Sequence, residues 1–176
     1  IHGNGGGDLL TIANGSLSTV VGPVTFTGDA ATDSVILNDQ AYAFGSTTTM
    51  TPTTVSRAFF GGLTYSTSER LILDTQDVAS TIEINGTAPN MTVTVNANNG
   101  TDTINVNETD PTTPVTISPS TGDDIVNINT GAIGSAGALF PATILLGALN
   151  IGAGGRGDIA SGGADKVLRT NSLTLT

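Results

Sequence analysis

The sequence predicts an all-β chain folded as a right-handed parallel β-helix (β-solenoid), with 22 residues per coil. Three observations lead to this fold class: segments in which apolar and polar residues alternate, a constant spacing between those segments, and loops of two alternating kinds. Alternation with a period of two is typical of strands that bury one face. Six consecutive apolar pairs begin 11 residues apart: Leu71/Leu73, Ile82/Ile84, Val93/Val95, Ile104/Val106, Val115/Ile117 and Val126/Ile128.

The loops between these segments alternate in composition. Every second strand is preceded by a Gly-x-Asp sequence, at residues 100–102 and again at 122–124. The intervening loops, at 85–89 and 107–114, contain proline and lack this sequence. Because the two Gly-x-Asp sequences are 22 residues apart, one structural unit holds two strands, and equivalent residues of successive units are expected to stack about 4.8 Å apart.

The pattern divides the chain into four parts and is interrupted twice. The predicted parts are N-terminal coils at residues 1–37, an insertion at 38–60, regular coils at 61–130, and C-terminal coils with a Gly/Ala-rich insertion at 131–176. We expect the first insertion to form an extra strand pair or a projecting loop. Its Phe59 and Phe60 would then be either a plug packed on the solenoid or part of a partner-binding surface. Because the strand pattern runs into the last residues, we expect a truncated segment of a longer protein.

Composition and charge exclude several classes of function. The chain has 5 Lys and Arg against 15 Asp and Glu, and a net charge of −10, which would repel the phosphates of a nucleic acid. It has no run of about 18 apolar residues, so membrane insertion is not expected. There is no cysteine and a single histidine, His2, so disulfides and cysteine-based zinc sites are excluded. Catalysis by a nucleophile and a histidine is not expected, and we predict no enzyme.

A family resemblance gives the pattern a biological context. Residues 62–73, the Gly-x-Asp-x-U-x-U units that follow them (U is apolar) and the tail at 148–175 resemble large repetitive surface proteins of environmental bacteria, planctomycetes especially. The resemblance covers most of the chain. It implies secretion or a cell-surface location and a structural role in a stalk, an adhesin or a self-assembling fibre. The implied partners are further copies joined end to end, the rest of a longer chain, or surface glycans.

A calcium-binding repeat module is the first alternative, and calcium is the one cofactor that the sequence suggests. Residues 3–10 come close to the Gly-Gly-x-Gly-x-Asp-x-U repeat of calcium-binding β-rolls. Carboxylates stacked about 4.8 Å apart repel each other by about 3–4 kcal/mol at an effective dielectric constant of 20. Either a bound Ca²⁺ or backbone N–H donors in a turn would remove this cost, and both readings stay open. The candidate ligands are Asp8, Asp102, Asp123 and Asp124.

A polysaccharide-active enzyme is the second alternative. Arg70, Asp74, Asp77 and Glu83 are expected near one corner of the coils, and paired carboxylates can act as acid and base in glycoside cleavage. The other outward positions are Thr, Asn, Ser or Pro, with no aromatic residues to stack against sugar rings. The sequence therefore favours a solvated acidic corner.

Overall fold

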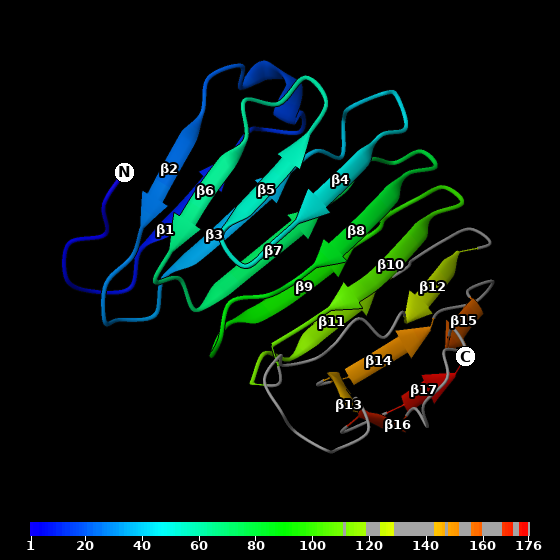
Figure 1. Ribbon diagram of the computed structural model, residues 1–176. Coiled ribbons are helices and arrows are strands. Elements are labelled where there is room, and N and C mark those ends of the chain that lie inside the picture. The colour runs from blue at the N-terminus through cyan, green and yellow to red at the C-terminus, as the bar shows by residue number, and fades with distance from the viewer. Residues whose placement is uncertain are drawn as a thin grey trace.

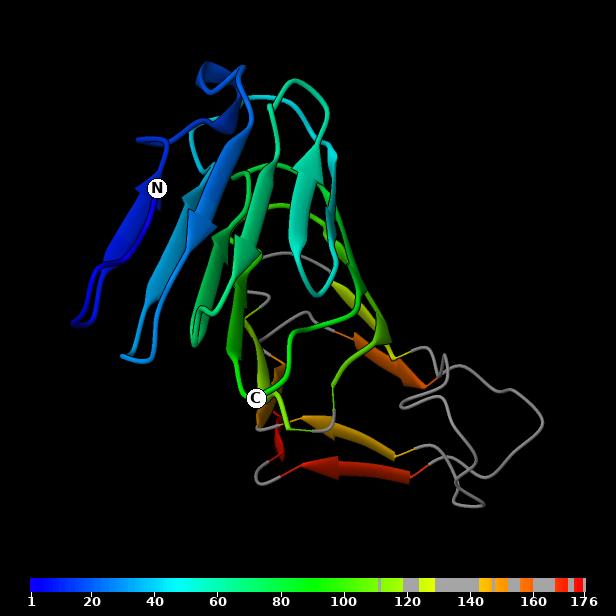
Figure 2. The same ribbon diagram turned by 60° about the vertical axis from the view of Figure 1, so that its left-hand side comes forward.

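The chain is all-β, as predicted. The computed structural model describes residues 1–110, 112–118 and 124–128, and the backbone of five further strands between residues 143 and 175. Nearly all strands of this part belong to two large sheets whose inner faces enclose the core (Figures 1 and 2). No helix within it has the length and hydropathy needed to cross a membrane. The second predicted insertion, residues 131–141, lies outside the described residues.

Parallel pairing joins all neighbours of the first sheet, which we name sheet I. Its strands, in spatial order, are β1 (Leu9–Ile12), β3 (Ser34–Asn38), β7 (Arg70–Asp74), β9 (Thr92–Asn96), β11 (Val115–Ser118), β14 (Ala148–Ile151) and β17 (Leu173–Leu175). The second sheet, sheet II, is mixed. Its order is β15 (Arg156–Ile159), β12 (Ile125–Ile128), β10 (Thr103–Glu108), β8 (Thr81–Asn85), β4 (Thr47–Met50), β5 (Thr54–Arg57), β6 (Leu63–Ser66) and β2 (Val24–Thr27).

The predicted 22-residue spacing appears in the strand register. From β7 to β12, successive strands alternate between the two sheets, and β7, β8, β9 and β10 each pair in parallel with the strand two places later. In sheet I, Val93 lies between Leu71 and Val115; in sheet II, Ile104 lies between Ile82 and Val126. Each of these partners is 22 residues from its neighbour in sequence, so like residues repeat along both sheets.

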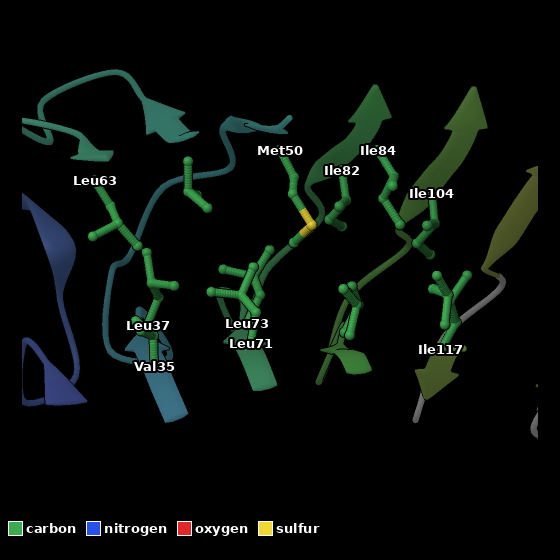
Figure 3. Close-up of a cluster of buried hydrophobic side chains, with 14 of the residues drawn as sticks. Val35, Leu37, Met50, Leu63, Leu71, Leu73, Ile82, Ile84, Ile104 and Ile117 are labelled. Atoms are coloured by element: carbon green, nitrogen blue, oxygen red, sulfur yellow. The ribbon is translucent and has the colours of Figure 1, made fainter. Parts of the chain in front are cut away.

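The core is the layer of apolar side chains between the two sheets. Each strand from β7 to β11 contributes two inward residues, and Figure 3 shows Leu71 and Leu73 of sheet I facing Ile82 and Ile84 of sheet II. Burying one such side chain contributes about 1.5–3 kcal/mol. Of the twelve inward residues predicted from the six pairs, the side chain of Ile128 lies outside the described part, and the other eleven are buried: Leu71, Leu73, Ile82, Ile84, Val93, Val95, Ile104, Val106, Val115, Ile117 and Val126.

The insertion at residues 38–60 adds a strand pair to sheet II. Strand β4 pairs in parallel with β8, and β5 runs antiparallel to both β4 and β6. Between β2 and β8, sheet II therefore holds three strands, whereas sheet I holds only β3 between β1 and β7. Large side chains fill this wider end of the core, among them Phe26, Met50 and Tyr65, whose hydroxyl donates to the carbonyl of Thr51 over 2.6 Å.

Two further elements complete the described part. A short 3-10 turn, η1 (Leu17–Thr19), lies between β1 and β2 and buries Leu17 completely. The strands β13 (Thr143–Leu146) and β16 (Val167–Thr170) form a separate parallel pair. The loops around η1, between β3 and β4, and between β5 and β6 come together at one side of the molecule, where they form the pocket described below.

Candidate functional site

The structure places the predicted calcium ligands in different sheets. Asp8 directly precedes β1 of sheet I, whereas Asp102 and Asp124 directly precede β10 and β12 of sheet II. Asp123 lies outside the described residues. Within the described ranges, no three His, Cys, Asp or Glu side chains come close enough together to hold a metal ion.

Asp102 and Asp124 act as acceptors for backbone amides. The Oδ1 atom of Asp102 accepts hydrogen bonds from the amide and the hydroxyl of Ser80, both over 2.7 Å. The amide of Asp102 in turn donates to Oδ1 of Asp124 over 2.8 Å. Each carboxylate thus holds the residue 22 positions earlier, and both aspartates are almost completely buried. Backbone N–H groups therefore satisfy one oxygen of each carboxylate, but they come from the segment 22 residues earlier and not from the turn of the aspartate itself.

Asp102 and Asp124 form an aspartate ladder, and burial changes the acidity of Asp102. Removal from water raises the pKa of Asp102, and the nearby charge of Asp124 raises it further, while the two hydrogen bonds from Ser80 lower it. Among the described residues, no hydrogen bond reaches the buried Oδ2 atom of Asp102. The net effect is a pKa of Asp102 above its ordinary value.

Sheet I carries an equivalent ladder at its N-terminal end. Oδ1 of Asp33 accepts the amide of Asp8 over 2.7 Å, and the amide of Asp33 donates to Oε2 of Glu69 over 2.7 Å. These three residues directly precede β1, β3 and β7. An acidic side chain before the strand therefore ties neighbouring strands of both sheets together.

A calcium test follows from these ladders. Because backbone amides already occupy the Asp33, Asp102 and Asp124 carboxylates, we expect equal melting temperatures in excess chelator and in millimolar CaCl₂. Calcium at a concentration of 100 times its Kd would add about 2.7 kcal/mol to the free energy of unfolding. This gain raises Tm by roughly 5–10 °C in a chain of this size. Circular-dichroism melts measure Tm, and MgCl₂ is the matched control. A rise of this size with CaCl₂ but not with MgCl₂ would contradict the expectation.

The residues of the enzyme alternative are spread over both sheets. Arg70 and Asp74 are the first and last residues of β7, about 13 Å apart along the strand, and Glu83 lies on β8 of the other sheet. The carboxylates of Asp74 and Glu83 accept hydrogen bonds from asparagines 22 residues away. Asn96 donates to Asp74 and Asn105 donates to Glu83, both over 2.6 Å. Asp77, in the loop after β7, accepts a bond from Asn99 over 3.3 Å. These side chains belong to polar ladders along the sheets.

A concave feature of the described part is an aromatic pocket beside the strand insertion. Its volume is about 730 Å³. The chain contains five Phe, two Tyr and no Trp, and four of these seven aromatic residues meet here. Phe44 and Phe59 are 69% and 78% exposed, and Val21 is 84% exposed. The lining consists of Ser18, Val21, Tyr42, Phe44, Gly45, Phe59 and Phe60.

A buried ion pair packs against Tyr42, one of the residues that line the aromatic pocket. The guanidinium of Arg57 lies 4.2 Å from the ring centroid of Tyr42, and its Nε is 2.7 Å from Oδ2 of Asp39. Oδ1 of Asp39 accepts bonds from Nη2 of Arg57 over 2.8 Å and from the amide of Leu17 over 2.7 Å. The side-chain amide of Gln76 also donates to this carboxylate. Asp39 therefore fixes η1, β5 and the loop after β7 relative to one another.

The pocket residues correspond only in part to the sequence predictions. Phe60 is 9% exposed and packs in the core, as expected for a plug, but Phe59 points outward. The φ angle of Phe59 is +62°, a left-handed conformation that bulky residues rarely adopt, and it separates the two rings. Tyr42, Phe44 and Asp39 were not predicted. The available signal was the clustering of four aromatic residues between positions 42 and 60.

Comparison with known proteins gives no match to the chain: no family model fits it, and neither a curated protein nor a solved structure is significantly similar to it.

Proposed function

We propose that the chain is a structural module of a secreted or cell-surface protein, forming part of a stalk, an adhesin or a self-assembling fibre. In this proposal the two sheets are the faces of a right-handed parallel β-helix with 22 residues per coil. The observation that supports it best is the in-register parallel pairing of β7 to β12, which repeats with the same 22-residue offset in both sheets. A unit of this kind transmits load along its axis through hydrogen bonds of the backbone.

Side-chain ladders add further bonds along the same direction. On the outer face of sheet II, Asn127 donates to Oδ1 of Asn105 over 2.9 Å, and Asn105 donates to Oε1 of Glu83 over 2.6 Å. The buried ladder of Asp102 and Asp124 repeats at the start of the same strands. Each 22-residue unit is therefore held to its neighbours by the backbone, by the core and by polar side chains. This redundancy favours a rigid element over a catalytic one.

The first strand offers an edge at which a second copy can pair. Strand β1 is the end of sheet I, and the carbonyl of Asp8 accepts the amide of Ser34 on the β3 side. Backbone groups of alternate residues point to opposite edges of a strand, so those of Leu9 and Thr11 point away from β3. Such an edge is a template for another strand. Leu9 is 65% exposed there and would be covered by the added strand.

Blocking this edge tests the proposal. We expect the protein to form end-to-end assemblies as its concentration rises, visible by sedimentation velocity and negative-stain microscopy. The variant Thr11→Pro removes an outward N–H at an exposed position, where proline is tolerated on edge strands, and should remain monomeric. Thr11→Ser keeps the N–H and should assemble like the parent. Compact monomers alone at high concentration of the parent chain, or unchanged assembly of a folded Thr11→Pro, would contradict the proposal.

A further inference from the structure

We propose that the aromatic pocket binds small organic cations with an alkylated ammonium group. Its volume of about 730 Å³ falls within the 300–1,000 Å³ that is usual for small-molecule sites. Tyr42, Phe44, Phe59 and Phe60 supply four rings, whereas the other two aromatic residues of the described part, Phe26 and Tyr65, are buried. The faces of aromatic rings carry partial negative charge and attract alkylated ammonium groups.

The charges around the pocket favour a cation over an anion. None of the lining residues is basic, and the guanidinium of Arg57 beneath Tyr42 is engaged by both carboxylate oxygens of Asp39. An anionic ligand would therefore find no exposed positive partner among the lining residues. The net charge of −10 also draws cations toward the surface and repels anions.

One ring of the pocket, that of Tyr42, already contacts a cation that lies outside the lining. Arg57 lies 4.2 Å from the centroid of Tyr42, and Phe44 meets the same tyrosine edge to face, with ring centroids 5.7 Å apart. The ring of Tyr42 is thus held between two neighbours. Phe44 and Phe59, at 69% and 78% exposure, keep most of their surface available to a ligand.

The left-handed backbone at Phe59 places its ring in the pocket rather than in the core. Its φ of +62° costs on the order of 1–3 kcal/mol for a residue with a bulky side chain, and it is accompanied by the exposure of a large apolar surface. The next residue, Phe60, satisfies the packing requirement of the core. The outward position of Phe59 is therefore not needed for folding, and a ligand that covers the ring would account for it.

Choline and its neutral isostere 3,3-dimethylbutan-1-ol separate cation recognition from simple apolar burial, because they share a shape and differ in charge. We expect NMR titration at low salt to show choline binding at least about fivefold more tightly than the alcohol, which corresponds to about 1 kcal/mol. Equal affinities of the two probes would overturn the proposal, as would the absence of choline binding at tens of millimolar.

Leucine variants identify the rings that carry this preference. Phe44→Leu and Phe59→Leu keep an apolar side chain at exposed positions, and each should reduce the choline preference at least about twofold. Ile1→Ala, which removes a comparably exposed apolar side chain outside the pocket, should leave it unchanged. Circular-dichroism melts establish that each variant is folded. Choline binding that persists unchanged in both folded phenylalanine variants would place the site elsewhere and overturn the proposal.

Discussion

Replacing Asp39 by alanine is expected to destabilise the protein by about 3–5 kcal/mol, because it leaves the guanidinium of Arg57 buried without its partner. Both side chains are almost completely buried, with relative exposures of 0% for Arg57 and 1% for Asp39. The same substitution removes the acceptor for the amide of Leu17 and for the side chain of Gln76. Three segments that are far apart in sequence therefore lose a common contact.

Urea denaturation followed by circular dichroism measures this loss. The matched control is Asp77→Ala, which removes an exposed aspartate with a single 3.3 Å hydrogen bond and should change the free energy of unfolding by less than about 0.5 kcal/mol. A paired replacement, Asp39→Leu with Arg57→Met, removes both charges and should recover the part of the loss that comes from the unpaired guanidinium, while the Leu17 amide and Gln76 still lack their acceptor. A cost below about 1 kcal/mol for Asp39→Ala would show that the ion pair is not buried in solution.

Most of the strand positions could be predicted because strand formation here is a local property of the sequence. A residue such as Val93 is buried because its own segment alternates, and because the segments 22 residues away alternate in phase. Regular spacing then determines which strands become neighbours, without knowledge of distant contacts. The insertion at 38–60 breaks this spacing, and its incorporation into sheet II depends on β4 and β5 pairing with each other and with β6.

The placement of Asp8 shows where local reasoning ends. Asp8 and Asp102 stand in similar Gly-x-Asp motifs before similar strands, yet they belong to different sheets. The sheet that a strand joins depends on how many strands precede it and on where an insertion returns the chain. Grouping the two aspartates as ligands of one kind of site ignored this dependence.

The aromatic pocket was missed for a related reason. Its supporting contacts join residues at unequal sequence separations: Asp39 bonds to residues 18, 22 and 37 positions away. Only the bond from Leu17 spans the 22-residue interval of the repeat, and the other two partners, Arg57 and Gln76, follow no interval that the sequence shows. The phenylalanines at 59 and 60 illustrate the same limit, since one backbone angle decides which ring enters the core.

The second large effect is expected at Asp102. Replacing it by alanine removes the acceptor of the Ser80 amide and hydroxyl, both in a buried position. A buried donor left without a partner costs about 1–3 kcal/mol, so we expect a loss of about 2–3 kcal/mol in the free energy of unfolding. Asp102→Asn keeps an acceptor oxygen at the same place and should lose less than half as much at neutral pH. Urea denaturation of the two variants decides the order.

The pH dependence of Asp102→Asn carries a definite sign. Burial raises the pKa of Asp102 above its ordinary value of 3.8, so between 3.8 and the raised value the folded state binds more protons than the unfolded state. The stabilising contribution of Asp102 is thus fully present below pH 3.8 and is lost as the pH rises through the folded pKa. The stability of the parent chain relative to Asp102→Asn should therefore fall over this interval.

A partly exposed aspartate, Asp29, provides a control of opposite sign. The amides of Ala31 and Gly5 donate to Asp29 and hold its pKa below 3.8. Its contribution is present above pH 3.8 and is lost as the pH falls through the lowered pKa, so stability relative to Asp29→Asn should rise with pH below 3.8. The stability of the parent relative to Asp102→Asn therefore falls with pH above 3.8, whereas its stability relative to Asp29→Asn rises with pH below 3.8. A flat curve for Asp102→Asn would mean that the Asp102 carboxylate is solvated. The stacked aspartates would then not hold neighbouring strands of sheet II together at their first residues.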